Sequence, residues 1–351
     1  MRTIQINSLD NVAVALSPIA KGETITAGEY TVTARCDIPQ GHKIALKKID
    51  KDTNVTKYGF PIGHATEEIE AGDWVHSHNM VTNLEGEVEY TYQPAITPVT
   101  PVEPETFNGF RRKDGRAAIR NEIWIIPTVG CVNDVAKRMV SLNQDLVKGS
   151  IDGLYTFDHP FGCSQTGADH AQTRKLLAAL VRHPNAAAVL VLGLGCENLT
   201  HEQFLEELGD YDQDRVKFLT CQEVEDEFEA GRKLLEECAE YAGQFKREPI
   251  PVSELVIGMK CGGSDGLSGI TANPTVGRFS DMMVARGGST VLTEVPEMFG
   301  AEGFLMNRCI NKDIFDKAVN MINGFKNYFI SHHEVVYDNP SPGNRQGGIT
   351  T

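Results

Sequence analysis

The sequence contains no apolar run approaching the roughly 18 residues that a membrane-spanning helix needs. Its first residues, MRTIQINSLD, lack the apolar core of a secretory signal peptide. Eight cysteines spread over 351 residues are too sparse for a disulfide framework. These absences predict a soluble, cytoplasmic protein whose thiols stay reduced.

Positive charge is also scarce. The chain has 33 Lys and Arg against 48 Asp and Glu, a net charge of −15. Nucleic-acid binding needs clustered Lys and Arg, so we expect no nucleic-acid partner, and no membrane partner is indicated. A small anionic substrate needs only a few local cations and is compatible with this balance, as is a homo-oligomer. Apolar residues make up 41% of the chain, enough for a sizeable core.

The local sequence pattern changes along the chain and predicts its domain organisation. Residues 1–90 alternate short β-type runs (3–6, 12–16, 30–33, 43–46 and 87–92) with Gly-containing turns, which is typical of a small β-rich module. Residues 91–108 are rich in proline and lack periodicity, so they form an extended linker. Residues 109–337 alternate strands with helices and form an α/β domain. Residues 338–351 read as a polar loop.

Six strand–helix units are expected between residues 109 and 337, so the fold class is α/β with a mostly parallel sheet. The expected strands are 123–129, 154–157, 187–194, 216–220, 254–259 and 290–295. The expected helices are 133–146, 168–182, 200–208, 224–245, 273–286, 302–309 and 312–329.

Four of these strands end at a Gly–Cys or Lys–Cys junction. The thiols are Cys131, Cys163, Cys196 and Cys261. Ligands of open α/β sheets bind outside the carboxyl ends of the strands, so these junctions indicate an active site and favour an enzyme over a scaffold. Their glycines also suggest backbone turns that form the floor of a pocket.

Two histidines, His76 and His78, follow a predicted strand in the β-rich module. On a strand, their spacing places both imidazoles on one face, as in a metal site or a substrate site. The alternative is a pair of surface histidines on an edge strand. His42 and His64, each beside a glycine, are candidates to join them.

Two further candidates lie at strand ends in the α/β domain. His159 follows Asp158 in a loop of polar residues, and its ordinary pKa suits a general base. The alternative is a histidine that caps a helix. Glu197 follows Cys196 and is suited to a metal ligand or a base, with simple turn chemistry as the alternative.

The segment KCGGSDGLSGITANP (260–274) is rich in glycine and hydroxyl residues and lies between a strand and a helix. Its backbone can approach a ligand closely and present N–H donors to a carboxylate. Arg120, beside the strand at 123–129, is suited to gripping a carboxylate with two hydrogen bonds. The alternative role for Arg120 is that of a solvated residue in a basic hairpin. Glu294, Glu297 and Glu302 follow the last predicted strand and are suited to cations or proton transfer.

Eight segments together resemble the altronate/galactarate dehydratase family of sugar-acid dehydratases, with altronate dehydratase the nearest pattern. They are KYGFPIG (57–63), HSHN (76–79), RNEIWIIPTVGCVN (120–133), GCSQ (162–165), RHPNAAAVLVLGLGCEN (182–198), CGGSDGLSGITANP (261–274), GRFSD (277–281) and TEVPEMFGAE (293–302). The resemblance runs from residue 1 to residue 351.

The resemblance implies an SAF-type module at residues 1–90 and a hydro-lyase that converts D-altronate to 2-dehydro-3-deoxy-D-gluconate in hexuronate catabolism, with Fe(II) or Mn(II). Family chains continue past residues 341–351, so we expect this sequence to be a fragment and residues 338–351 to lead toward a further region.

The chemistry assigns roles to the candidates. Dehydration removes the C2 proton and expels the C3 hydroxyl, and a chelated cation stabilises the charge that develops. We expect His76 and His78 to ligate the metal or transfer protons, with His159 and Glu197 as second candidates. Arg120, Ser264, Asp265, Ser268 and Asn273 are expected to bind the polyol and its carboxylate.

Three other readings stay open. Galactarate, or another hydroxy acid of the family, is the alternative substrate. An iron–sulfur cluster on Cys131, Cys163, Cys196 and Cys261 is the alternative cofactor, although their spacing is not a compact cluster motif. A non-catalytic sugar-acid-binding protein is the alternative class.

Overall fold

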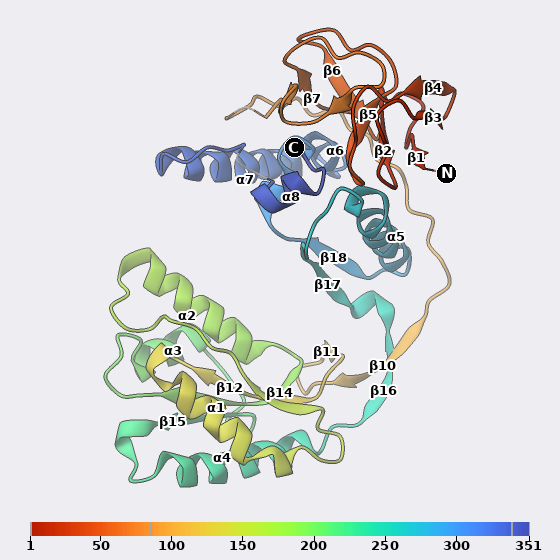
Figure 1. Ribbon diagram of the computed structural model, residues 1–351. Coiled ribbons are helices and arrows are strands. Elements are labelled where there is room, and N and C mark those ends of the chain that lie inside the picture. The colour runs from red at the N-terminus through yellow and green to blue at the C-terminus, as the bar shows by residue number, and fades with distance from the viewer. Residues whose placement is uncertain (1, 85, 338–339, 351) are drawn as a thin grey trace. The chain divides into compact units, whose positions relative to one another are not determined.

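The structure, a computed structural model, describes residues 2–84, 86–337 and 340–350. The contacts divide the chain into two compact units. Unit 1 combines residues 1–102 with residues 256–351, and unit 2 consists of residues 103–255. The chain thus forms part of unit 1, then all of unit 2, and then returns to unit 1 (Figure 1).

The amino-terminal part of unit 1 consists of short antiparallel strands in three small sheets. In order of pairing they are β1 (Thr3–Ile4), β2 (Val12–Ala15), β5 (Lys43–Ala45) and β8 (Trp74–Val75); β3 (Thr24–Ala27) and β4 (Tyr30–Thr33); and β6 (Asn54–Lys57), β7 (Phe60–Ala65) and β9 (Met80–Val81). Along β3, Ile25 and Ala27 are buried and Thr24 and Thr26 are exposed, as the two-residue period of a strand requires.

The carboxyl-terminal part of unit 1 is an α/β segment. Its strands β17 (Val256–Met259) and β18 (Ser289–Leu292) form a two-stranded parallel sheet. Its helices are α5 (Ala272–Ala285), α6 (Glu302–Met306), α7 (Lys312–Ser331) and α8 (Pro342–Gln346). Asn311 caps α7 by accepting a hydrogen bond from Ile314 N at 2.9 Å. Phe315 and Ile322 of α7 then pack into the apolar cluster of this segment.

Unit 2 contains a four-stranded parallel sheet, in the order β13 (Gly153–Thr156), β12 (Glu122–Pro127), β14 (Ala186–Gly193) and β15 (Val216–Thr220). Helices α1 (Asn133–Leu142) and α4 (Glu227–Ala242) cover one face, and α2 (Gly167–Arg182) and α3 (His201–Leu208) cover the other (Figure 1). Alternate residues of β12 serve the two faces, since Ile123 and Ile125 pack with α1 and α4 while Trp124 and Ile126 pack with α2 and α3.

The α/β class is confirmed, and every expected strand and helix of the segment 109–337 is present within a few residues of its expected bounds. The single continuous sheet is wrong, because the six parallel strands divide into a sheet of four and a sheet of two. A second sheet of unit 2 was missed: β11 (Ala117–Ala118), β10 (Thr106–Arg111) and β16 (Arg247–Pro251) pair antiparallel. Residues 87–92 are not a strand.

The contacts place a division between Leu255 and Val256, inside the range 109–337 that the sequence predicts as one domain. Residues 91–105 have no regular secondary structure, and β10 begins at Thr106 within the expected linker. The expected loop 338–351 contains α8; its residues 338, 339 and 351 lie outside the described part of the chain. In the part of the chain that is described, no helix combines the length and apolarity needed to cross a membrane.

Candidate functional site

Three loops meet at the carboxyl edge of the four-stranded sheet in unit 2. Gly130 N donates to Phe161 O at 2.8 Å, and Asn198 N donates to Gly162 O at 3.2 Å. Gly162 has φ +100° and lies so close to Thr128 O that a side chain there would collide with it. The exposed thiols of Cys131, Cys163 and Cys196 lie on these loops. Three of the four predicted cysteine junctions therefore lie at one edge of one sheet.

His159 has both ring nitrogens in use. Its Nδ1 accepts a hydrogen bond from Phe161 N at 3.2 Å, so the proton lies on Nε2, which donates to Pro127 O at 2.8 Å. The ring thus ties its loop to the end of β12. A general base needs a free nitrogen, and this arrangement leaves none.

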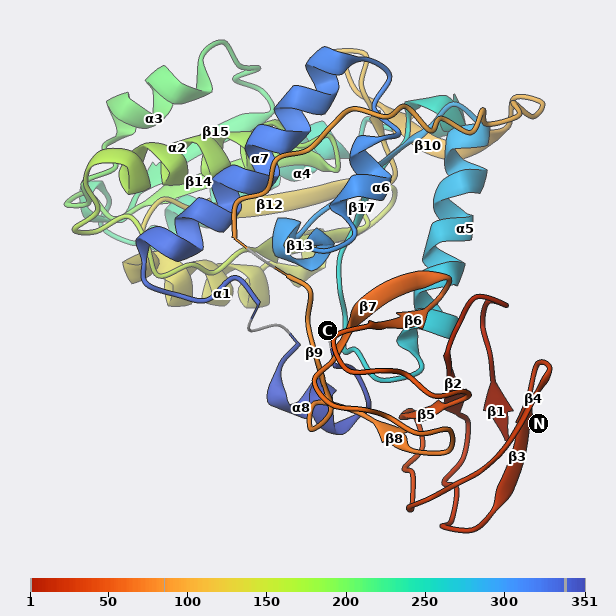
Figure 2. The same ribbon diagram turned by 90° about the horizontal axis from the view of Figure 1, so that it is seen from above.

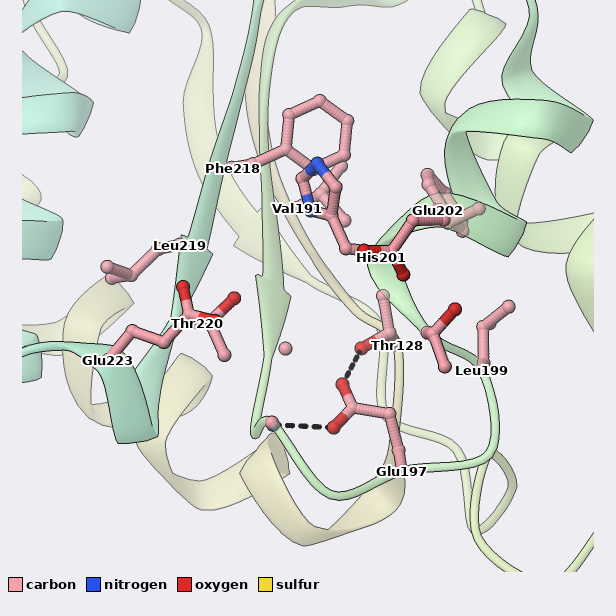
Figure 3. Close-up of a pocket in the computed structure, with 14 residues that line it drawn as sticks. Thr128, Val191, Glu197, Leu199, His201, Glu202, Phe218, Leu219, Thr220 and Glu223 are labelled. Carbon is pink, nitrogen blue, oxygen red and sulfur yellow. Dashed lines mark hydrogen bonds between the residues drawn. The ribbon is translucent and has the colours of Figure 1, made fainter.

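Glu197 is likewise engaged through both oxygens (Figure 3). Oε1 accepts hydrogen bonds from Thr128 Oγ1 at 2.8 Å and Leu194 N at 3.0 Å, and Oε2 accepts one from Gly195 N at 2.6 Å. Burial raises the pKa of Glu197, but hydrogen bonds, of which the one from Gly195 N is the strongest, outweigh burial and lower it. The carboxylate holds the turn after β14 together.

A cavity of about 250 Å³ lies beside Glu197, between the ends of β14 and β15 and α3 (Figure 3). The strand order reverses between β12 and β14, which is where open α/β sheets bind ligands. Three carboxylates line the cavity, those of Glu197, Glu202 and Glu223, and its described lining contains no Lys or Arg. Such a lining repels a sugar-acid carboxylate.

Arg120 lies at the amino end of β12, whereas Thr128 follows its carboxyl end. Six strand residues separate these ends by about 20 Å. The Arg120 side chain is exposed and pairs with Glu122 at 2.9 Å. Arg120 is close to the strand in sequence, but it lies at the edge of the sheet opposite the three loops.

A different cluster lies in unit 1, where His42 and Lys43 of the β-rich module meet the segment that follows α8. His42 is 3% exposed. Its Nδ1 accepts a hydrogen bond from Trp74 Nε1 at 3.1 Å, so its Nε2 carries the proton and lies 2.9 Å from Gln346 O. Because indole only donates, His42 is fixed in one neutral tautomer. Figure 2 shows α8 beside β8 and β9.

Lys43 is the most deeply buried cation of this cluster, at 1% exposed. Its ammonium donates a hydrogen bond to Gly348 O at 3.0 Å. Burial, and after it the charge of Lys57, lowers the pKa of Lys43 to about 7. Lys57 is also buried, which lowers its pKa to about 8.

His76 lies next to His42, with ring centroids 4.8 Å apart, and stacks on Trp74. Its Nδ1 is buried, and no residue of the described chain offers it a hydrogen bond. Burial is the main cause that lowers the pKa of His76 to about 4, and Coulombic repulsion from Lys43, His42, His78 and Arg345 adds to it. His76 is therefore a neutral imidazole near pH 7.

The expectation that His76 and His78 lie on a strand is wrong. β8 ends at Val75, and both histidines lie in the turn that follows, where Asn79 Oδ1 accepts from His76 N at 3.0 Å. Both rings pack against Trp74, His78 at 5.1 Å between centroids. His42 does join His76 as expected, whereas His64 lies on β7 and bonds Asn83.

The glycine-rich loop reaches the same cluster. Gly266 N donates to Gly347 O at 2.9 Å, and a side chain at Gly266 would collide with the backbone of Gly41 and Gly347. The loop thus contacts both the β-rich module and the segment after α8 through the Gly266 backbone, and the Tyr58 side chain of the module lies against Gly269. Sequence reasoning anticipated close backbone approach here, but expected a ligand rather than two other segments of the chain.

Within this loop the predicted polar residues bond mainly to one another. Asp265 N donates to Ser268 Oγ at 3.0 Å, and Asp265 Oδ1 accepts from Leu267 N at 2.8 Å. Ser264 Oγ lies 3.4 Å from the exposed Cys261 thiol. Asn273 is exposed at the start of α5.

The three glutamates after β18 are dispersed. Glu294 accepts a hydrogen bond from Cys261 N at 2.8 Å and pairs with Lys260. Glu302 is buried and paired with Lys326 at 3.1 Å. Glu297 lies in a 3-10 turn, Val295–Met298.

The metal site expected at His76 and His78 stays a prediction. Among the described residues, no three His, Cys, Asp or Glu side chains are grouped so that they could hold one ion. In the histidine cluster, His42 already uses both nitrogens. The arrangement also offers no iron–sulfur ligand set within the described chain.

Three family models match the chain along its length. An "Altronate/galactarate dehydratase SAF domain" matches residues 1–83, a "D-galactarate dehydratase/Altronate hydrolase, second domain" matches residues 109–243, and a "D-galactarate/Altronate dehydratase, C-terminal" region matches residues 252–351. The chain belongs to this family of sugar-acid dehydratases. It is therefore an enzyme of a lyase family, and its SAF-type module is confirmed.

Curated relatives agree with this assignment. The chain is 52% identical to the altronate dehydratase of Escherichia coli (strain K12), with 100% of this chain and 72% of the relative covered. It is 53% identical to the altronate dehydratase of Bacillus subtilis (strain 168), with 99% and 71% covered. The galactarate dehydratase (L-threo-forming) of Escherichia coli (strain K12) is 32% identical, with 99% and 69% covered.

Sequence reasoning missed Lys43 and Trp74. The available signal was a lysine inside an apolar strand, in the run HKIAL at 42–46. A buried lysine is rare unless it is paired.

Proposed function

We propose that this chain dehydrates D-altronate to 2-dehydro-3-deoxy-D-gluconate, and that the reaction uses the cluster around His76 in unit 1. The two altronate dehydratases at 52% and 53% identity support this substrate over galactarate, whose dehydratase is 32% identical. The observation that carries the site is a buried imidazole nitrogen of His76 that lacks a partner among the described residues, within a positively charged cluster.

The chemistry needs a base and an acid. In this proposal the unprotonated His76 takes the C2 proton of the hydroxy acid, and its low pKa keeps it unprotonated at neutral pH. The C3–O bond then breaks, and the hydroxide leaves as water after it receives a proton. The resulting enol becomes the 2-keto-3-deoxy acid. His78, on the same indole, is the candidate proton donor.

The loop 261–274 supplies polyol contacts in this proposal. Ser264, Asp265, Ser268 and Asn273 are the candidates, because contacts through Gly266 hold this loop against the segment that carries His42. His159 and Glu197 act as positioning residues for the loops of unit 2, since their polar atoms are already engaged. Arg120 has no part in this proposal.

Fe(II) or Mn(II), which the family resemblance implies, enters no step, because the described side chains do not form a ligand set. Metal content and metal dependence are measured separately, by elemental analysis of the protein and by assays with and without each ion.

The test is a dehydration assay of the purified chain on D-altronate, galactarate and (2R)-sulfolactate. We expect 2-keto-3-deoxy acid from D-altronate at the highest kcat/KM. A higher value on galactarate overturns the substrate assignment. Absence of product from all three acids, with and without Fe(II) or Mn(II), overturns the catalytic assignment and leaves a binding function.

A further inference from the structure

The buried Lys43 ammonium has few hydrogen-bond partners and no counter-ion among the described residues. An ammonium has three N–H donors, and the described residues give this one a single hydrogen bond, to the neutral carbonyl of Gly348. No carboxylate pairs with Lys43 among the described residues. A buried charge without a counter-ion is costly, so its presence at 1% exposure calls for a function.

Two cations, Lys57 and Arg345, and three histidines surround Lys43 and the neighbouring His76. The β-rich module contributes His42, His76, His78 and Lys57, and the carboxyl-terminal segment contributes Arg345. Of the acids on this side, Asp10 acts on Lys57, and Asp265 lies on the loop that contacts Gly347. This cluster lies in a chain of net charge −15, so it is a local exception to an acidic protein. A positive, partly desolvated centre favours an anionic ligand.

The Gly348 carbonyl, which accepts the hydrogen bond of the Lys43 ammonium, is suited to displacement by a ligand. Residues 346–348 contact the module through two carbonyls, Gln346 O on His42 and Gly348 O on Lys43. The segment also accepts a hydrogen bond from Gly266 N at Gly347 O, 2.9 Å, and its backbone approaches that of Gly41. A carboxylate is a stronger acceptor for an ammonium than a neutral carbonyl, since hydrogen bonds between ionised partners are about twice as strong.

We propose that Lys43 binds the carboxylate of the hydroxy-acid substrate, which replaces the Gly348 carbonyl as the acceptor of the Lys43 ammonium. This inference rests on the proposed function for its substrate class. It adds a residue and a movement of residues 346–348 that the dehydration chemistry alone does not require.

The first test removes the Lys43 ammonium from the enzyme and the carboxylate from the ligand, first separately and then together. The ligands are the 3-deoxy analogue of D-altronate, which cannot lose water from C3, and the corresponding alditol, which lacks the carboxylate. We expect the parent enzyme to bind the acid at least about tenfold more tightly than the alditol. Lys43→Met abolishes this preference, and Lys47→Met, at an exposed lysine just after β5, retains it. Retention of the preference in Lys43→Met overturns the proposal.

The main measurement of the second test uses the parent enzyme, and a variant serves only as its control. Lys43 has a pKa of about 7, so at pH 8 most of it is neutral, and binding a carboxylate requires it to gain a proton. Titration calorimetry of the parent enzyme in two buffers of different ionisation enthalpy should then show uptake of up to about one proton per chain at pH 8. The uptake persists in Lys57→Met, which removes the other lysine of low pKa. Tight binding of the acid without proton uptake overturns the proposal.

A third readout separates the failure of this inference from failure of the proposed function. The chain has two tryptophans, Trp74 in unit 1 and Trp124 in unit 2, so fluorotryptophan labelling gives one ¹⁹F resonance in each. Binding at Lys43 shifts the Trp74 resonance, because Trp74 bonds His42. Turnover of D-altronate with a shift of Trp124 alone overturns this inference and leaves the proposed function standing. Absence of turnover together with a shift of the Trp74 resonance overturns the proposed function and leaves this inference standing.

Discussion

The ionisable residues at the sheet edge of unit 2 and those in the cluster of unit 1 differ in how many of their polar atoms are engaged. In unit 2, His159 and Glu197 use every side-chain nitrogen and oxygen for hydrogen bonds to nearby loops. In unit 1, the buried Lys43 ammonium and the buried Nδ1 of the half-buried His76 have hydrogen-bonding capacity that no described residue uses. Both regions contain the residue types of an active site, but of these four residues only Lys43 and His76 keep polar atoms that can act on a ligand.

The largest expected effect concerns the structural role on the unit 2 side of this comparison. Glu197→Ala leaves Thr128 Oγ1, Leu194 N and Gly195 N without their acceptor, so we expect the free energy of unfolding of unit 2 to fall by about 2–4 kcal/mol. Urea denaturation followed by the ¹⁹F resonance of Trp124 measures it. Glu206→Ala, an exposed position of α3, is the control. Equal stabilities of the two variants would contradict the structural role of Glu197.

A pH dependence of stability tests the unit 1 side. The pKa of His76 is about 4 in the folded chain against an ordinary 6.5, so between these values the unfolded chain binds more protons than the folded one. Stability of unit 1 therefore rises with pH across this window and is lost as the pH falls from 6.5 toward 4. His76→Gln should flatten this dependence, although His42, whose pKa is also lowered, keeps part of the slope.

Denaturation of parent and His76→Gln enzymes at several pH values, followed by Trp74, provides the measurement. Parallel pH profiles would show that His76 is no more perturbed than a surface histidine, and would remove it from the comparison.

The smallest expected effect is at Arg120. Its ion pair with Glu122 is solvent-exposed on the arginine side, so Arg120→Ala should change the free energy of unfolding by less than about 1 kcal/mol. Because Arg120 lies at the amino end of β12, kcat and KM for D-altronate should stay at the parent values. A large rise in KM would assign Arg120 to the substrate and contradict its exclusion from the site.

The sequence predicted regular elements well because their periodicity is local. The helix at 312–329 was expected from its apolar spacing and is present as Lys312–Ser331. Partition of strands between sheets was not predictable, since β17 and β12 carry the same apolar signature and only long-range pairing separates them.

The site was predictable in part for a similar reason. Residue type identified His76, but it also identified His159, which differs only in what surrounds its nitrogens. The burial of Lys43 depends on residues 346–348, about 300 positions away in the chain, and no local pattern encodes such a contact. The family resemblance supplied the reaction class that residue chemistry alone left open.

The most direct test of this account is a side-by-side measurement of kcat for D-altronate dehydration in His76→Gln and His159→Gln, each verified as folded by its two ¹⁹F resonances. We expect His76→Gln to lower kcat by at least about 100-fold, as loss of a general base does, and His159→Gln to keep a kcat close to that of the parent enzyme. A folded His76→Gln enzyme with parental kcat, or a collapse of kcat confined to His159→Gln, would contradict it.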